Sequence, residues 1–318
     1  MCFYYVFINF YMKKKIIIVS ILAATLIVAG CTHQKQLNIP TVAPSSSESS
    51  DTTNIPNNQK PITDNEGDGH IVTPAGSRVS VSNINSFKKG QNTIAFKLFG
   101  IDSHEFGDKD LRTFHDKKLH LIIVRDDMQD FMHIHPEYKD SKWTVGALLN
   151  LSGAYNMYLD FDPLEEKPTV LRVPFNVDSE TYTKDFPRIT PDMKIEVDGY
   201  VATLVLGSSP KTNETVKLDY LITKDGKPVE NIKPYLGAYG HAVMFRQTDV
   251  DDYFHVHALD TIKPTQGTVR FETDFPLIGR YTIFGQFNIN DKVVTFPITI
   301  DVLEEGSGAE SEVLNLHQ

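Results

Sequence analysis

Cysteine is nearly absent from this chain. The sequence contains two cysteines, Cys2 and Cys31, so the long segment after Cys31 cannot supply a disulfide, a thiolate metal ligand or a cysteine nucleophile. No window has the apolar spacing of an amphipathic helix, which favours a fold built of strands. Basic residues are in the minority, because 31 Lys and Arg stand against 41 Asp and Glu and leave a formal net charge of −10. An acidic chain is a poor match for nucleic acid, so we predict no nucleic-acid partner.

Long apolar runs are rare, and the clearest one lies near the N-terminus. Three lysines at residues 13–15 precede an apolar run at residues 16–29, and Cys31 follows shortly after it. This order is typical of a signal peptide, and the residues up to Cys31 resemble a bacterial lipobox. We expect a signal peptide at residues 1–30, with Met12 as the true start, and lipidation of Cys31. A retained transmembrane anchor is the alternative, but the run is short for a membrane span.

Composition divides the rest of the chain into a polar segment and a strand-rich segment. Residues 31–68 contain few large apolar side chains, so beyond the lipidated cysteine we expect a disordered, flexible tether. From about residue 69 onward, short runs of β-branched and aromatic residues alternate with Gly, Pro, Asn and Asp. This pattern predicts an all-β fold of two tandem β-sandwich domains, at residues 69–180 and 190–305, with a frayed tail at residues 306–318.

A histidine pattern that occurs twice is the strongest functional signal. A lone histidine opens an apolar run ending in Arg at residues 120–125 (HLIIVR), and an acidic turn leads to residues 133–135 (HIH). The same order recurs at residues 241–246 (HAVMFR) and 255–257 (HVH). Each half then continues with a Gly-x-Tyr strand, and the small differences in spacing fall in the connections. The pattern indicates a duplicated domain.

The spacing of these histidines predicts a metal site in each half, or one six-histidine site if the two halves face each other. Residues i and i+2 of a strand point to the same face, so each His-x-His pair projects together while Ile134 and Val256 face the core. A short connection joins each pair to the strand opened by the lone histidine, and the two strands are expected to pair. Three converging imidazoles with an open position suit copper or zinc. The predicted ligands are the first triad, His120, His133 and His135, and the second triad, His241, His255 and His257.

Other side chains near the triads leave alternatives open. A thioether would favour Cu(I), but Met132 has the parity of the buried face and Met128 has no methionine counterpart in the second half. His115 is expected on the surface, with a role as fourth ligand beside His120 as the alternative. The remaining histidines expected on the surface are His33, His70, His104 and His317. The turn carboxylates could orient histidines, although solvated turn residues are the simpler interpretation: Asp126, Asp127, Asp130, Asp249, Asp251 and Asp252.

These motifs resemble a family of secreted bacterial proteins with duplicated immunoglobulin-like domains. The family pattern is Leu-His, an apolar strand, an acidic turn, Phe-x-His-x-His-Pro and Gly-x-Tyr. The first half matches at Leu119, His120, Asp127, Phe131 and residues 133–136 and 153–155, and the second at Gly240, His241, Phe254 and residues 255–257 and 279–281. The second half lacks the proline, so we expect the first triad to be the better site. The resemblance covers most of residues 80–303 and implies immunoglobulin-like sandwiches and a heavy metal, copper above all.

The combined prediction is a lipid-anchored protein on the extracytoplasmic face of the cell membrane. It would bind copper or zinc for handling or sequestration, with a membrane metal transporter or a metalloprotein as a candidate partner. An enzyme is not expected. Glu137 lies too close to His135 for the cupin pattern, and no serine nucleophile elbow or phosphate-binding loop stands out. The alternative is a metal-free adhesion or scaffolding lipoprotein in which the histidines are structural.

Overall fold

The computed structural model describes residues 69–72, 76–178, 181–259 and 263–304. The predicted signal peptide, the predicted lipidation site Cys31, the predicted tether and the predicted C-terminal tail lie outside these residues, as do His33 and His317. The described residues fall within a single compact unit. Among them no helix is long and apolar enough to cross a membrane.

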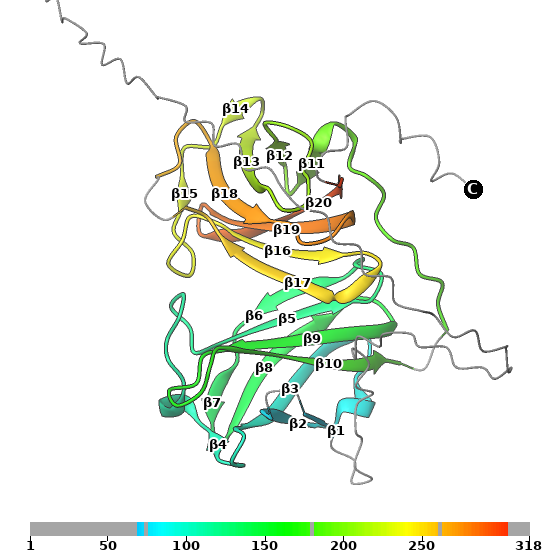
Figure 1. Cartoon of the computed structure of the whole chain (residues 1–318), viewed down its shortest axis with the longest axis vertical. Helices are drawn as coiled ribbons and strands as arrows, with labels where there is room; N and C mark the ends of the chain where they lie inside the picture. Colours follow the sequence, from blue (N-terminus) through cyan, green and yellow to red (C-terminus); the bar gives the residue numbers. More distant parts are fainter. Residues whose placement is uncertain (1–68, 73–75, 179–180, 260–262, 305–318) are drawn as a thin grey trace, which may run out of the picture. The chain divides into compact units, whose positions relative to one another are not determined.

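Two packed sheets form the first sandwich (Figure 1). The strands of its larger sheet are β1 (Gly69–Val72), β2 (Arg78–Ser82), β3 (Gly90–Phe99), β4 (Glu105–Phe106), β7 (Glu137–Lys139) and β8 (Lys142–Leu149). Their order is β1-β2-β3-β8-β7, with β4 paired to β3. The smaller sheet has the order β10-β9-β5-β6 and contains β5 (Leu119–Arg125), β6 (Phe131–Ile134), β9 (Gly153–Phe161) and β10 (Thr169–Val177). The core between them includes Trp143, Tyr155 and Phe161.

The second sandwich repeats this plan. One sheet contains β11 (Lys194–Val197), β12 (Tyr200–Val205), β13 (Thr215–Lys224), β14 (Lys227–Pro228) and β18 (Thr268–Asp274), and β18 pairs with β13. The other has the order β15-β19-β16-β17 and contains β15 (Ile232–Lys233), β16 (His241–Arg246), β17 (Asp249–His257), β19 (Gly279–Ile289) and β20 (Lys292–Val302), with β20 paired to β19. Three 3-10 helices, η1 (Ile84–Ser86), η2 (Asp108–Asp110) and η3 (Pro191–Met193), lie among the described strands.

The predicted all-β fold of two tandem immunoglobulin-like sandwiches is confirmed. Every strand pair within the four described sheets is antiparallel, and each sandwich has its own apolar core. The Gly-x-Tyr motif also has the same role in both. The Tyr155 hydroxyl lies 2.9 Å from the Leu151 carbonyl, and the Tyr281 hydroxyl donates to the Leu277 carbonyl at 2.9 Å. This is the tyrosine corner typical of immunoglobulin-like sandwiches. The exact domain limits stay a prediction.

The histidine-bearing sheets of the two sandwiches pack against each other. Strand β5 is buried at all seven positions, which requires a neighbour on both faces of its sheet. One face, including Leu121, lies in the first core. The opposite face joins a separate apolar cluster shared by both sandwiches, which we call the inter-repeat cluster. Its buried members are Ile122, Val124, Met128, Tyr158, Val243, Phe245 and Phe284.

Aromatic rings close this inter-repeat cluster in two matching places. Phe131 stacks on Phe284, with ring centroids 4.1 Å apart and planes 4° apart. Tyr253 stacks on Tyr158 at 4.9 Å and 10°. Phe131 and Tyr253 occupy the same place before each His-x-His pair, and Tyr158 and Phe284 the same place in the Gly-x-Tyr strands. The two repeats therefore contribute equivalent residues in exchanged positions.

Candidate metal centre

The strand pairings that position the histidines are those expected from the short connections. Strand β5 pairs with β6, and β16 pairs with β17. In the second repeat the register sets His241 directly opposite His257. In the first repeat Ile122 lies opposite His133. Each lone histidine is therefore brought next to its His-x-His pair.

The residues between the histidines have the predicted orientation. Ile134 and Met132 pack against the first core, and Val256 and Phe254 against the second. The match of Phe254 to the family's aromatic position is therefore wrong. Tyr253, which lies beside the inter-repeat cluster, is the structural counterpart of Phe131.

Within each triad the ring nitrogens converge. One nitrogen from each of the three histidines lies within 4.8 Å of the other two, in both triads, so each triad could hold a metal ion. In the first, His120 Nδ1 is 3.0 Å from His133 Nε2. In the second, His241 Nδ1 is 3.4 Å from His255 Nε2. Two imidazoles bound tetrahedrally to zinc at 2.0–2.1 Å have nitrogens about 3.3 Å apart, so these separations fit a shared ion.

The outer nitrogens of the same rings show where the protons are. His120 Nε2 lies 3.2 Å from the Phe114 carbonyl, and His241 Nε2 lies 2.7 Å from the Tyr235 carbonyl. A carbonyl can only accept, so both Nε2 atoms carry hydrogen and both Nδ1 atoms present a lone pair to the triad.

The middle histidines are oriented in the same way by oxygen atoms of side chains. His133 Nδ1 lies 2.8 Å from Gln286 Oε1, and His255 Nδ1 lies 3.3 Å from Asp160 Oδ2. Because the Gln286 oxygen accepts, the inner Nε2 atom of His133 is assigned a lone pair. In the first triad two neutral rings thus have two hydrogens for three contacts, and this assignment leaves His120 Nδ1 and His133 Nε2 facing each other without a hydrogen between them. A cation placed there would replace this repulsion with two coordination bonds.

The last histidine of each triad has a buried nitrogen without a partner. Among the described residues, neither His135 Nε2 nor His257 Nε2 has a hydrogen-bond acceptor or donor. Buried polar atoms are normally hydrogen-bonded. The same atom is unpaired in both repeats, which leaves it available to a ligand in each triad.

Burial keeps these imidazoles neutral. Desolvation, followed by the nearby histidines, lowers the pKa of His120, His135 and His241 to about 3 and that of His257 to about 2. Desolvation also lowers the pKa of His133 well below its usual value. Because only the neutral ring binds a metal ion, these five histidines need not lose a proton at neutral pH before they coordinate.

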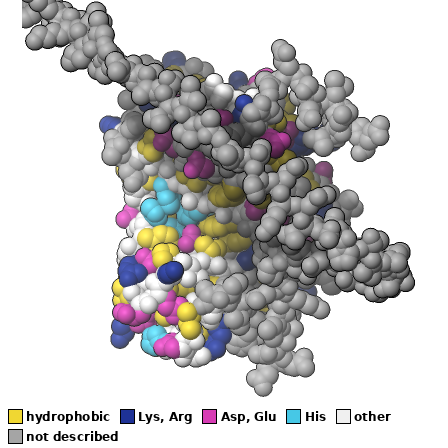
Figure 2. Space-filling model, viewed as in Figure 1, with side chains coloured by type: hydrophobic (Ala, Val, Ile, Leu, Met, Phe, Trp, Pro, Cys, Tyr) yellow, Lys and Arg dark blue, Asp and Glu magenta, His cyan; other side chains and the backbone are white. Residues whose placement is uncertain are grey.

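The two triads are next to each other. The ring centroid of His255 lies 5.1 Å from that of His133 and 5.5 Å from that of His120. These distances match those inside one triad, such as 5.3 Å between His120 and His133. The sequence left open whether there are two separate sites or one. The structure places all six imidazoles in one cluster between the facing sheets, and Figure 2 shows histidine side chains gathered on the surface in view.

His115 belongs to this cluster, although not beside His120 as a fourth ligand would. Its ring stacks on His257 of the other repeat, with centroids 3.5 Å apart, and lies 6.3 Å from the ring of His120. No periodicity pointed to this, because the equivalent position of the second repeat is Leu236. His104, by contrast, is exposed as expected and lies 3.5 Å from Asp110.

The methionines fill apolar space. Met132 packs on the first core, as its parity predicted. Met128 has a positive φ of 64° in the turn and is buried in the inter-repeat cluster.

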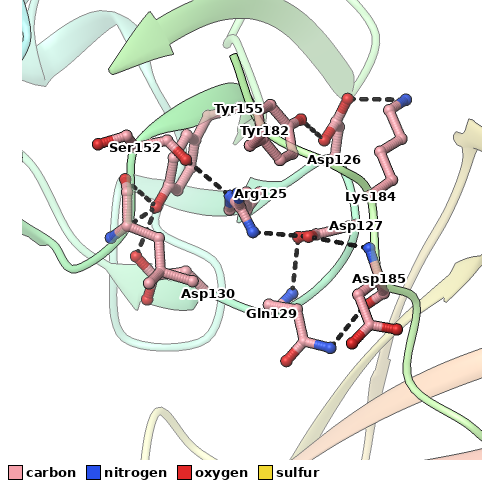
Figure 3. Close-up of polar contacts among 11 residues, drawn as sticks. Arg125, Asp126, Asp127, Gln129, Asp130, Ser152, Tyr155, Tyr182, Lys184 and Asp185 are labelled. Atoms are coloured by element: carbon pink, nitrogen blue, oxygen red, sulfur yellow. Dashed lines mark hydrogen bonds and ion pairs between the residues drawn. The ribbon is translucent and has the colours of Figure 1, made fainter. Parts of the chain in front are cut away.

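The acidic turn of the first repeat is neither solvated nor engaged with the triads (Figure 3). Asp127 is fully buried and pairs with Arg125 at 2.6 Å. Asp130 accepts from Tyr155 at 2.8 Å. Asp126 pairs with Lys184 at 2.8 Å, in the connection between the repeats. Both expectations for these carboxylates were therefore wrong, because they brace the turn and the connection instead. The second repeat keeps part of this arrangement in an ion pair between Arg246 and Asp252.

Comparisons with solved structures give distant similarities. The chain is similar to a mutant of Salmonella alpha-2-macroglobulin (11% identity, TM-score 0.22, 73% of this chain and 15% of that one) and to native E. coli alpha-2-macroglobulin (10%, 0.24, 73% and 14%). It is also similar to a tetra-tandem repeat in the extending region of a large adhesion protein (9%, 0.23, 70% and 48%). The chain thus spans less than half of each of these structures. No curated protein matches it.

The family comparison is specific and agrees with the duplication. One family model, described as "Domain of unknown function (DUF8832)", matches the chain twice, at residues 75–181 and 195–304. The two matches contain the first and the second triad respectively, which confirms the repeat. The chain belongs to the family "Domain of unknown function (DUF8832)".

Proposed function

We propose that this protein binds copper or zinc through the two histidine triads, for metal handling or sequestration. The observation that carries the proposal is the convergence of ring nitrogens in each triad, with His120 and His133 nitrogens 3.0 Å apart and His241 and His255 nitrogens 3.4 Å apart. Such an arrangement is unfavourable in an empty buried site and favourable around a cation. Nitrogen-only ligands with an open position suit either metal. The role proposed is binding and not catalysis.

Metal analysis of the strand-rich part of the chain tests this proposal. Residues 69–305, dialysed against copper or zinc and measured by elemental analysis, are expected to retain up to one ion per triad. Changing His120, His133 and His135 together to Ala should remove the share of the first triad, because three of its nitrogen ligands are lost. His104→Ala, which removes an exposed histidine outside the triads, is the matched control and should change nothing. Substoichiometric metal that is the same in all three proteins would favour the metal-free scaffold.

We further propose that Cys31 carries a lipid and holds the protein on the extracytoplasmic face of the cell membrane. The lysines, the apolar run and the small residue before Cys31 support this assignment. A membrane metal transporter or a metalloprotein is the proposed partner, because a tethered binding protein can reach such a site. In cells fed labelled palmitate, Cys31→Ser should abolish labelling and release the protein from the membrane fraction. Retention of the variant in the membrane with no label in the parent would favour a transmembrane anchor.

A further inference from the structure

The two triads are built alike except in two places: the group that orients the middle histidine, and His115, whose ring stacks on His257 of the second triad. In both, the lone histidine is held by a backbone carbonyl, and the last histidine has an unpartnered Nε2. The middle histidine of the first triad, His133, meets the amide oxygen of Gln286. The middle histidine of the second, His255, meets the carboxylate of Asp160.

Both orienting groups come from the opposite repeat. Asp160 lies on β9, where it pairs across the ladder with His120, yet its oxygen contacts His255 of the second repeat. Gln286 occupies the same place on β19 opposite His241, and contacts His133 of the first repeat. The middle histidine of each triad is therefore oriented by a residue of the other sandwich. The two orienting residues hold equivalent positions but differ in charge, because Asp160 is a carboxylate and Gln286 a neutral amide.

This difference in charge changes the ligands. A carboxylate that accepts from the outer N–H of an imidazole makes the inner nitrogen a stronger donor to a metal ion than a neutral amide does. Burial strengthens the effect, since the side chains of His255 and Asp160 are only 4% and 17% exposed. The carboxylate also offsets part of the positive charge that a bound ion brings into the site.

We propose that the second triad is the tighter metal site, and that Asp160 is the positioning residue that makes it so from the first repeat. This inference rests on the proposed metal binding and reverses the sequence-based expectation that the first triad is the better site. Changing the residue that orients a metal-binding histidine typically costs 10- to 100-fold in metal affinity. A gap of that size is expected between the two triads.

The proximity of the triads adds to the inequality. Because rings of the two triads lie as near as 5.1 Å, ions held in both would repel each other. A divalent ion should therefore fill the second triad first and bind the first triad more weakly afterwards. Two monovalent Cu(I) ions would show a smaller gap between the two steps, since the repulsion scales with the product of the charges.

Zinc titrations of full-length protein with one triad disabled test the proposal. His135→Ala leaves only the second triad complete, and His257→Ala leaves only the first. Both variants remove a ring whose Nε2 has no hydrogen-bond partner in the described part of the chain. His257→Ala also removes the ring on which His115 stacks, so circular dichroism of both variants checks that the fold is kept. Zinc should bind 10- to 100-fold more tightly to the His135→Ala protein.

Substitutions of Asp160 and Gln286 then test whether the orienting groups cause the difference in zinc affinity between the triads. Asp160→Asn, added to His135→Ala, should weaken zinc binding 10- to 100-fold, and added to His257→Ala should leave it within a few-fold. Gln286→Glu should strengthen binding by the first triad. Asp162→Asn is the matched control, because it makes the same chemical change at a carboxylate that pairs with Arg112 at 2.8 Å, and it should leave both affinities unchanged.

The outcomes separate this inference from the proposed function. If neither single-triad protein binds zinc or copper, the proposed function fails and the inference with it. If both bind equally and Asp160→Asn has no effect on the second triad, only the inference is overturned. Equal weakening of both triads by Asp160→Asn would also overturn it, because that result indicates a general attraction of cations and not the orientation of His255.

Discussion

Acidification from pH 7 to pH 5 is expected to lower the free energy of unfolding of the metal-free protein steeply. Burial lowers the folded-state pKa of His120, His135 and His241 to about 3 and that of His257 to about 2, whereas an unfolded chain has histidines near their usual 6.5. At pH values between the folded-state and unfolded-state pKa, these histidines are protonated in the unfolded chain and neutral in the folded protein.

Proton linkage gives the direction in which the free energy of unfolding changes with pH. Stability rises with pH wherever the unfolded state binds more protons, so the contribution of these histidines is complete above about pH 6.5 and is lost as pH falls toward about 3. Each such group contributes a slope of up to about 1.4 kcal/mol per pH unit inside that window. Several groups acting together make the folded state intolerant of moderate acid.

Urea denaturation at pH 7.5, 6.5 and 5.5 measures this effect. The single tryptophan, Trp143, is buried in the first core and reports its unfolding by fluorescence. A variant with His135→Asn and His257→Asn should show a flatter dependence on pH, whereas His104→Asn should follow the parent protein. A urea midpoint that is constant from pH 7.5 to 5.5 would contradict the burial of these rings between the sheets.

Phe284→Ala is expected to destabilise the protein by about 3–5 kcal/mol, the usual cost of removing a buried phenylalanine ring. Phe284 is 4% exposed and stacks on Phe131 across the inter-repeat cluster. Its loss would leave a cavity between two rigid sheets and would remove an aromatic pair that adds to the apolar burial.

The size of this loss tests whether the two sandwiches are stabilised by each other. Circular dichroism follows the whole protein during urea denaturation, and Trp143 fluorescence follows the first sandwich alone. Ile278→Ala, at a position that is 54% exposed, is the control and should change the midpoint little. If Phe284→Ala leaves the midpoint seen by Trp143 unchanged, packing against the second sandwich does not stabilise the first.

The parity of the strands could be predicted from the sequence, and the packing of the sheets could not. Period-two spacing placed Ile134 and Val256 toward the cores and the histidines on the opposite faces, as the structure has them. The apolar run at residues 121–124 within β5 is typical of a strand that is buried on both faces. It gave no information on which surface covers Ile122, because that contact depends on the three-dimensional arrangement of distant strands.

The contacts of the orienting groups and of the acidic turn could not be predicted from the sequence, for a related reason. Asp160 and Gln286 stand in strands where a polar residue normally indicates a solvent face, and their roles depend on a repeat that is far away in sequence. Asp127 lies in a turn whose composition is typical of a solvated loop. It is nevertheless buried, because its carboxylate pairs with the buried Arg125. A local sequence pattern predicts the secondary-structure element in which a residue lies. The contacts of these side chains are instead made with other elements, which the local pattern does not reveal.

The exchanged aromatic pairs of the inter-repeat cluster have an evolutionary consequence. A single repeat carrying such a face would be self-complementary and could close as a homodimer with two-fold symmetry. In a homodimer, one substitution changes both triads at once. Joining the two copies in one chain removes that restriction, since Asp160 and Gln286 can differ although they hold equivalent positions. Tandem fusion thus lets a symmetric interface hold two unlike sites.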